Sequence, residues 1–184
     1  MKIRSSALGF TLMELILVIV LLSILSLFAA SRFMGSGNFS AYALQERVIS
    51  VIRQVQVNRM QSNISIPNKP YPERCLPSSY KAGEDSSYTN FCLSITSTCI
   101  GSSAACNLAS KERDARSDVV VDNSAQFSII NGASSPIEFD LLGNPLNVSS
   151  AGISILIQDK NSQSQSQCRV LINPQGYVSE GACS

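Results

Sequence analysis

The feature that most limits how this chain can fold is an apolar run near its N-terminus. Between Phe10 and Ala30, twenty-one residues carry a single charge, that of Glu14. As an α-helix this run is about 31 Å long, which matches the hydrocarbon core of a bilayer. Lys2 and Arg4 precede it. By the positive-inside tendency, this end is expected in the cytosol and the rest of the chain across the membrane.

The cysteines all follow the apolar run. They are Cys75, Cys92, Cys99, Cys106, Cys168 and Cys183. An even number on the exported side predicts three disulfides formed in an oxidising compartment. The chain has no histidine and no Cys-x-x-Cys pair, so a zinc site is disfavoured, and we expect neither a metal nor another cofactor.

Six cysteines allow fifteen connectivities, so the pairing stays open at this point. Closeness in sequence favours Cys75 with Cys92 and Cys99 with Cys106. Cys168 and Cys183 flank an expected terminal hairpin, and their pairing is the best supported of the three.

Residues 1–31 have three interpretations. A secretory signal cut near Ala29 to Ser31 is usually shorter in its apolar part and lacks an internal carboxylate. A plain transmembrane anchor explains the length and the orientation. It gives Glu14 no role, although a charge inside a span costs about 2.5–3.5 kcal/mol. The third interpretation rests on a motif at the start of the run and supplies a partner for Glu14.

The apolar run opens with Gly9-Phe10-Thr11-Leu12-Met13-Glu14. This motif resembles the cleavage and methylation signature of type IV prepilins and type II secretion pseudopilins. The resemblance implies that a prepilin peptidase cuts between Gly9 and Phe10 and then methylates the new amine of Phe10. Glycine suits the site because it permits the extended, closely approached backbone that a peptidase needs. Residues 1–9 are then a leader peptide, and residues 10–30 form the helix of the membrane and the filament core.

Cleavage there makes Glu14 the fifth residue of the mature chain, about 6 Å along the helix from the new N-terminus. We assign Glu14 to subunit assembly, where its carboxylate neutralises the Phe10 amine of a neighbouring subunit. A buried charge pair is a poor source of stability, but it can fix register because a misaligned subunit leaves both charges unpaired. The alternative is a carboxylate that reaches lipid headgroups or water at the membrane surface.

Residues 31–65 are expected to continue the helix in amphipathic form. The apolar positions at helical spacing are Leu44, Val48, Val51 and Val55. Their stripe is expected to pack on the protein's own sheet. Gly35 and Gly37 can interrupt a helix that otherwise runs for about fifty residues and ends near Asn63.

Residues 66–184 are expected to form the exported globular domain. From Pro67 to Asp118 the chain is rich in Pro, Ser, Asn and Gly, which predicts a connecting loop ordered by disulfides in place of a core. After Asp118, alternating β-branched residues predict strands near 119–121, 127–130, 137–139, 153–157 and 170–172, with a terminal hairpin turning at 173–176. The predicted fold is α+β, pilin-like: a long N-terminal helix packed on an antiparallel sheet. The C-terminal strands also resemble those of H-type pseudopilins and of minor pilins of mannose-sensitive haemagglutinin pili.

Composition excludes several kinds of chemistry. Without histidine, neither a Ser-His-Asp nor a Cys-His catalytic arrangement is available, and we expect no enzyme. Asp114, Asp118 and Asp122 are spaced by four and are interpreted as a solvated face rather than an acid/base pair or a calcium site. The net charge is +1, and the basic residues at 111, 113 and 116 alternate with acidic ones, so no nucleic-acid partner is expected.

The resemblance implies a minor subunit of a type IV pilus, used for adhesion or attachment. Such a subunit waits in the bacterial inner membrane, as a single pass with a cytoplasmic N-terminus and a periplasmic domain, and then enters an extracellular filament. Its partners are other pilin subunits, the prepilin peptidase, the inner-membrane assembly platform and, before assembly, membrane lipid. Two alternatives stay open: a pseudopilin of a type II secretion system, and a pilus module that binds DNA or a surface.

Overall fold

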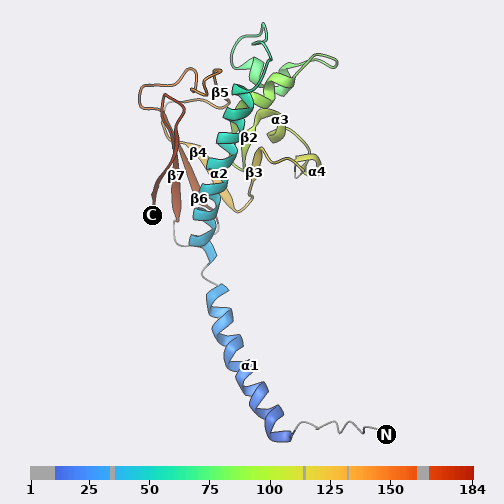
Figure 1. The fold of residues 1–184 in the computed structure, drawn as a ribbon, viewed down its shortest axis with the longest axis vertical. Coiled ribbons are helices and arrows are strands. Elements are labelled where there is room, and N and C mark those ends of the chain that lie inside the picture. The colour runs from blue at the N-terminus through green and yellow to red at the C-terminus, as the bar shows by residue number, and fades with distance from the viewer. Residues whose placement is uncertain (1–10, 34–35, 114, 132, 161–165) are drawn as a thin grey trace, which may run out of the picture. The chain divides into compact units, whose positions relative to one another are not determined.

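The chain separates into two compact units, Met1–Ser36 and Gly37–Ser184 (Figure 1). The computed structural model describes residues 11–33, 36–113, 115–131, 133–160 and 166–184. The first unit contains helix α1 (Leu12–Phe33), and helix α2 (Ser36–Met60) begins at the boundary and belongs to the second unit from Gly37 on. The predicted helix of about fifty residues is therefore represented by two helices, and Gly35 lies outside the described residues.

The second unit combines α2 with two antiparallel sheets. One sheet has the order β3 (Val119–Val121), β2 (Cys99–Ser102), β1 (Cys92–Ile95), β5 (Ile137–Glu138). The other has the order β4 (Ala125–Ile129), β6 (Ile153–Asp159), β7 (Gln167–Ile172), β8 (Val178–Cys183). Short helices lie between the strands: η1 (Glu73–Cys75), η2 (Pro77–Ser79), η3 (Ser87–Phe91), α3 (Ser103–Cys106) and α4 (Ser110–Arg113). The α+β class with antiparallel sheets is confirmed.

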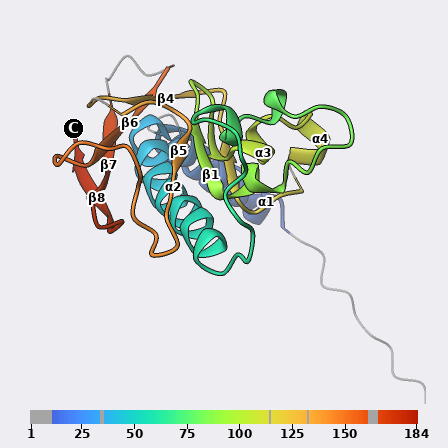
Figure 2. The same cartoon turned by 90° about the horizontal axis from the view of Figure 1, so that it is seen from above.

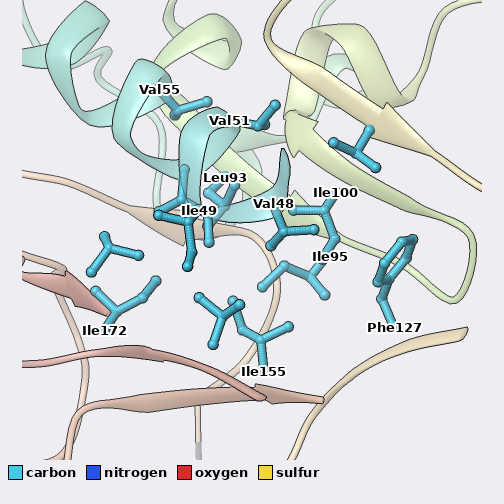
Figure 3. Packing of buried hydrophobic residues seen from close by; sticks show 14 of the residues in the cluster. Val48, Ile49, Val51, Val55, Leu93, Ile95, Ile100, Phe127, Ile155 and Ile172 are labelled. Atoms are coloured by element: carbon cyan, nitrogen blue, oxygen red, sulfur yellow. The ribbon is translucent and has the colours of Figure 1, made fainter. Parts of the chain in front are cut away.

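Helix α2 supplies one side of a core that both sheets share (Figures 2 and 3). Its buried apolar residues are Ala41, Leu44, Val48, Ile49, Val51, Ile52 and Val55. They recur every three or four residues, so they form one wide face of the helix. This face contacts Leu93, Ile95 and Ile100 from the first sheet and Phe127, Ile155 and Ile172 from the second within a single cluster. The stripe predicted from sequence is confirmed, and it is wider than predicted.

Strands β6 and β7 show why the second sheet forms. Their residues alternate between buried and less buried positions, as expected for a sheet with one face on the core. The register places Ile155 opposite Val170, so buried residues of both strands point to the same face. Figure 1 shows β6 and β7 side by side. The strands predicted here from this alternation are confirmed, and they pair antiparallel.

The turn between β7 and β8 depends on Asn173 and Gly176. Asn173 Oδ1 accepts the backbone N–H groups of Gln175 at 3.0 Å and Tyr177 at 2.8 Å. Gly176 has φ +81°, and a Cβ there would collide with the carbonyl oxygen of Gly143. Only glycine combines this conformation with so close an approach of two backbones. The predicted terminal hairpin is confirmed.

Two predictions about the exported domain were wrong. The stretch from Pro67 to Asp118 is not only a connecting loop, because it contains β1 and β2, whose Leu93 and Ile100 are fully buried. The domain also has two sheets instead of one. Strands β1 and β2 are each four residues long and lie among polar residues. The average composition of the stretch therefore indicated a loop.

The shared core predicts the effect of shortening one α2 side chain. Ile52 has no exposed surface, so Ile52→Ala removes buried methyl groups and leaves a cavity between helix and sheets. We expect a loss of about 2–5 kcal/mol in the free energy of unfolding. Urea unfolding of the full chain, followed by near-ultraviolet circular dichroism of its tyrosines, measures this loss.

Val57 lies on the same helix and is 44% exposed, which makes Val57→Ala the matched control. Its effect is expected within about 0.5 kcal/mol of zero. Equal losses for the two variants would contradict the position of the core.

Candidate functional site

The start of α1 carries the predicted assembly residue Glu14. The backbone N–H of Glu14 donates to Thr11 Oγ1 at 3.2 Å, so Thr11 caps the helix. Glu14 lies in the first turn, where a carboxylate is favoured by the helix dipole. Thr11 and Glu14 have the Thr-x-x-Glu spacing of a capping box, which marks a helix start in the sequence itself. No described residue hydrogen-bonds or pairs with the Glu14 carboxylate.

The apolar side chains of α1 are uncovered within their own unit. They include Leu12 at 76% exposure, Leu15 at 60%, Ile19 at 53%, Leu22 at 57% and Leu25 at 61%. The hydroxyls of Ser23 and Ser26 donate to the carbonyls of Ile19 and Leu22, each at 2.7 Å, so these serines add little polar surface. A helix that is apolar on all sides is stable only when something covers it.

No helix within the described residues has both the length and the apolar content that crossing a bilayer requires.

Gly9 and Phe10, the predicted cleavage site, lie outside the described residues. The six cysteines form three disulfides, Cys75–Cys92, Cys99–Cys106 and Cys168–Cys183. These are the pairs that the sequence favoured. The first joins η1 to β1, the second joins β2 to α3, and the third connects β7 to β8.

Polar side chains of α2 bind the backbone of the C-terminal hairpin. Gln45 Nε2 donates to the carbonyls of Arg169 at 2.6 Å and Gly181 at 3.1 Å. Arg53 donates to the carbonyl of Val178 at 2.8 Å. In the sequence, both residues lie between the apolar positions of the stripe. Gln45 adjoins the buried stripe, and its position in the helical period could have identified it.

The second unit also contains a buried charged network formed by Arg59, Arg74, Tyr88 and Glu138. Glu138 is 1% exposed and accepts two hydrogen bonds from Arg74, Nε to Oε1 at 3.0 Å and one terminal nitrogen to Oε2 at 2.7 Å. The Tyr88 hydroxyl donates to Glu138 Oε1. Burial, reinforced by this bond to Glu138, raises the pKa of Tyr88. We call these four residues the Glu138 network.

Arg59 connects the network to α2. Its guanidinium carbon lies 5.2 Å from the centre of the Tyr88 ring. Its Nε donates to the carbonyl of Phe139 at 3.3 Å, and a terminal nitrogen donates to the carbonyl of Ile64 at 3.1 Å. Beside the network, the Cys75–Cys92 disulfide packs with Tyr88 in a small apolar cluster. The network therefore holds the segment around η1 and η3 against α2 and β5.

The interpretation of Asp118 as part of a solvated face was wrong. Asp118 is 5% exposed and accepts two hydrogen bonds from Arg116, at 2.8 and 2.6 Å. Burial is the largest influence on the pKa of Asp118 and raises it, but the hydrogen bonds from Arg116 and Ser102 bring the pKa below its ordinary value. Arg116 also donates to Asn90 Oδ1 at 2.8 Å, so its charge is engaged inside the fold. Asp114 lies outside the described residues.

Asp122 has a local role in its turn. Its Oδ1 accepts the backbone N–H groups of Ser124 at 2.8 Å and Ala125 at 3.2 Å. These bonds order the chain where it enters β4.

Within the described residues, no three side chains of the metal-binding types lie together as a ligand set. No family model, no curated protein and no solved structure matches this chain. What the described geometry offers is a rigid unit, fixed by engaged charges and disulfides, and a separate apolar helix with one carboxylate in its first turn.

The Glu138 network predicts which ion pair matters for stability. Arg74→Met leaves the Glu138 carboxylate buried without its positive partner, since the two side chains are 20% and 1% exposed. Breaking a buried pair in this way is expected to lower the free energy of unfolding by about 3–5 kcal/mol. Urea unfolding of the full chain measures the loss.

Lys69 provides the control, because its ion pair with Glu84 at 3.0 Å lies at the surface. Lys69→Met removes an equivalent charge and is expected to leave the unfolding midpoint where it was. A midpoint shift of the same size in both variants would show that the buried pair has no special role.

Proposed function

We propose that this chain is a subunit of a helical filament of the type IV pilin kind, released from a short leader by a prepilin peptidase. The observation that carries the proposal is the position of Glu14, the single charge of the apolar run Phe10–Ala30 and the fifth residue after the predicted cut between Gly9 and Phe10. A plain anchor explains the apolar residues but not the carboxylate. Assembly gives the carboxylate a partner.

The surface of α1 supports this proposal. Its apolar side chains are between 41% and 76% exposed from Leu12 to Leu25, which is unfavourable in water. Membrane lipid before assembly, and the helices of other subunits afterwards, cover such a surface. The same helix thus anchors the subunit in the inner membrane before assembly and forms part of the filament core afterwards.

Register in the filament follows from Glu14 and the new N-terminus. Cleavage leaves a positively charged amine on Phe10, and methylation keeps it basic. A neighbouring Glu14 carboxylate neutralises this amine in an apolar environment, where an unpaired charge is expensive. A subunit shifted by one helical turn leaves both charges unpaired, and the filament therefore accepts one alignment.

The second unit is the exported part of the subunit in this proposal. Packing of α2 on antiparallel sheets supports a pilin-like fold, with an assembly platform of the inner membrane as a further partner. Three disulfides suit a domain exposed to an oxidising environment. They favour a minor subunit of a surface pilus that serves attachment. Its presence in filaments sheared from cells, and not only in membranes, separates a pilus subunit from a secretion pseudopilin.

The proposed processing predicts the N-terminus of the native chain. Intact-mass and N-terminal analysis of protein from its own host is expected to find a chain that begins at methylated Phe10. Gly9→Leu places a bulky side chain at the cut, and this variant is expected to keep its leader. A native chain that still begins at Met1, or that is trimmed near Ser31, would contradict the proposal.

The proposed register predicts a separate effect for Glu14. Glu14→Ala removes the partner of the Phe10 amine, so we expect normal leader removal but at least about a tenfold loss of assembled subunit, the loss that about 1.4 kcal/mol produces. Quantitative immunoblots of sheared filaments and of membranes measure both steps. Ser23→Ala, which removes a hydroxyl bonded only within the helix, is the control on the same helix. Normal assembly of Glu14→Ala would refute the docking role.

A further inference from the structure

A groove of about 830 Å³ opens in the second unit between two segments that are distant in sequence. One wall is the chain that leaves α2, residues 62–66. The other wall is the turn after β5, with Leu141, Leu142 and Leu146. The volume lies in the range of ligand-binding clefts, and the surface within the groove is mostly apolar.

The leucine wall is rigid. Asp140 Oδ1 accepts the backbone N–H groups of Leu142 and Asn144, each at 2.8 Å, and Asp140 Oδ2 accepts the Asn144 amide at 2.9 Å. Gln56 of α2 donates to the carbonyl of Gly143 at 2.9 Å. This bonding holds Leu141 and Leu142 in place although they are 55% and 76% exposed. Large apolar side chains on a fixed turn are unfavourable unless something covers them.

The opposite wall has free backbone groups. Asn63, Ser65 and Ile66 belong to no helix or strand, and none of their backbone N–H or C=O groups bonds to a described residue. Ile64 differs, since its carbonyl accepts a hydrogen bond from Arg59 and its side chain packs beside Tyr88. The segment is therefore anchored in the middle and unpaired on either side. Unpaired main chain beside apolar side chains is what an added strand requires.

The charges at the groove are already engaged. The Arg59 guanidinium donates to Phe139, Ser62 and Ile64, and the Asp140 carboxylate accepts three hydrogen bonds from its own turn. A charged ligand would find no free counter-charge on these two residues. The groove accordingly favours an uncharged occupant.

A second copy could offer only an edge strand of its sheets, which is β3, β4, β5 or β8. Strands β3 and β5 have only three and two residues, the outer edge of β4 already donates from Phe127 N–H to Ser97, and two carbonyls of β8 accept hydrogen bonds from α2. None of these described edges is both unoccupied and as long as residues 62–66. An α-helix, in turn, satisfies its own backbone and would leave the free groups of residues 63–66 unmatched.

We propose that this groove binds an extended, uncharged apolar segment of a different protein, added as a strand beside residues 62–66. Main-chain hydrogen bonds to the unpaired groups give affinity, and alternate side chains of the ligand contact Leu142 and Leu146. The inference concerns the second unit alone and stands apart from the proposed role of α1.

Fluorescence anisotropy with the full chain in detergent micelles tests the proposal. The probe is a labelled eight-residue peptide of alternating valine and threonine. Two matched peptides carry methyl groups on the backbone nitrogens of alternate residues, one set for each edge of the strand. Because only one edge pairs with residues 62–66, we expect one methylated peptide to bind at least about tenfold more weakly and the other to bind like the parent.

Protein variants locate the binding. Leu142→Asp places a charge on the exposed leucine wall, and we expect it to weaken binding at least about tenfold. Leu171→Asp changes an exposed leucine outside the groove, and we expect little effect. The thermal unfolding midpoint of each variant shows whether it is folded. The methylated peptides test the unaltered chain and do not depend on that result.

Each contrary result overturns the proposal. Equal binding of all three peptides would show apolar adsorption without strand pairing. Preference for an amphipathic helical peptide would make the groove a helix site. Self-association of the chain that Leu142→Asp abolishes would assign the groove to a second copy. Absence of peptide binding at millimolar concentration would leave the leucines without this role.

Discussion

The apolar face of α2 is the contact on which the second unit depends. Both sheets place their buried side chains in one cluster with it, through residues such as Ile100 in the first sheet and Ile155 in the second. The sheets contact each other where β4 lies beside β1 and the turn that follows it, and Phe127 N–H donates to the carbonyl of Ser97 in that turn at 3.1 Å. The main apolar surface of each sheet still needs the helix. Removing α2 would expose the buried apolar faces of both sheets.

Polar side chains of α2 fix the rotation and position of the helix on this apolar core. An apolar stripe alone allows a helix to rotate or slide by a turn at modest cost, because dispersion contacts are not directional. Gln45, Arg53 and Gln56 each reach a backbone carbonyl of the C-terminal hairpin or its turn. A shift of α2 would break all of these bonds together. The bonds also occupy acceptors along β8, which ends its sheet and would otherwise attract another strand.

The sequence revealed the elements whose signal is local. Leu44 and Val48 follow the helical period, and β6 and β7 alternate over six or seven residues, so their type and their inner face could be predicted. Strands β1 and β2 were missed because each has four residues and lies in a stretch rich in Pro, Ser, Asn and Gly, whose composition indicates a loop. The ion pair of Arg74 and Glu138 joins residues 64 apart, and nothing in a single sequence indicates which charges meet in the fold. Asp118 was misread for the same reason, since spacing alone does not report burial.

The candidate functional residues show the same difference between local signals and contacts made by residues distant in sequence. Glu14 could be identified because one charge in a long apolar run is unusual in any chain, and its partner could be proposed from the adjoining motif. The groove could not, because its walls come from segments about seventy-five residues apart and become neighbours only when β5 pairs with β1 and Arg59 engages the loop after α2.

Within the described residues, the apolar surface of α1 and that of the groove differ in whether their backbone groups are hydrogen-bonded. In α1 the main-chain groups bond to one another along the helix, and even Ser23 and Ser26 donate to backbone carbonyls. Such a surface gains most from a medium or a neighbour that is apolar and has no need of hydrogen bonds, which describes lipid tails and other apolar helices. The groove of the second unit places free N–H and C=O groups beside its leucines, and an apolar medium there would leave those groups unsatisfied at several kcal/mol each. The two proposals agree with this difference, since lipid tails and other helices suit α1 and a ligand with its own unpaired backbone suits the groove.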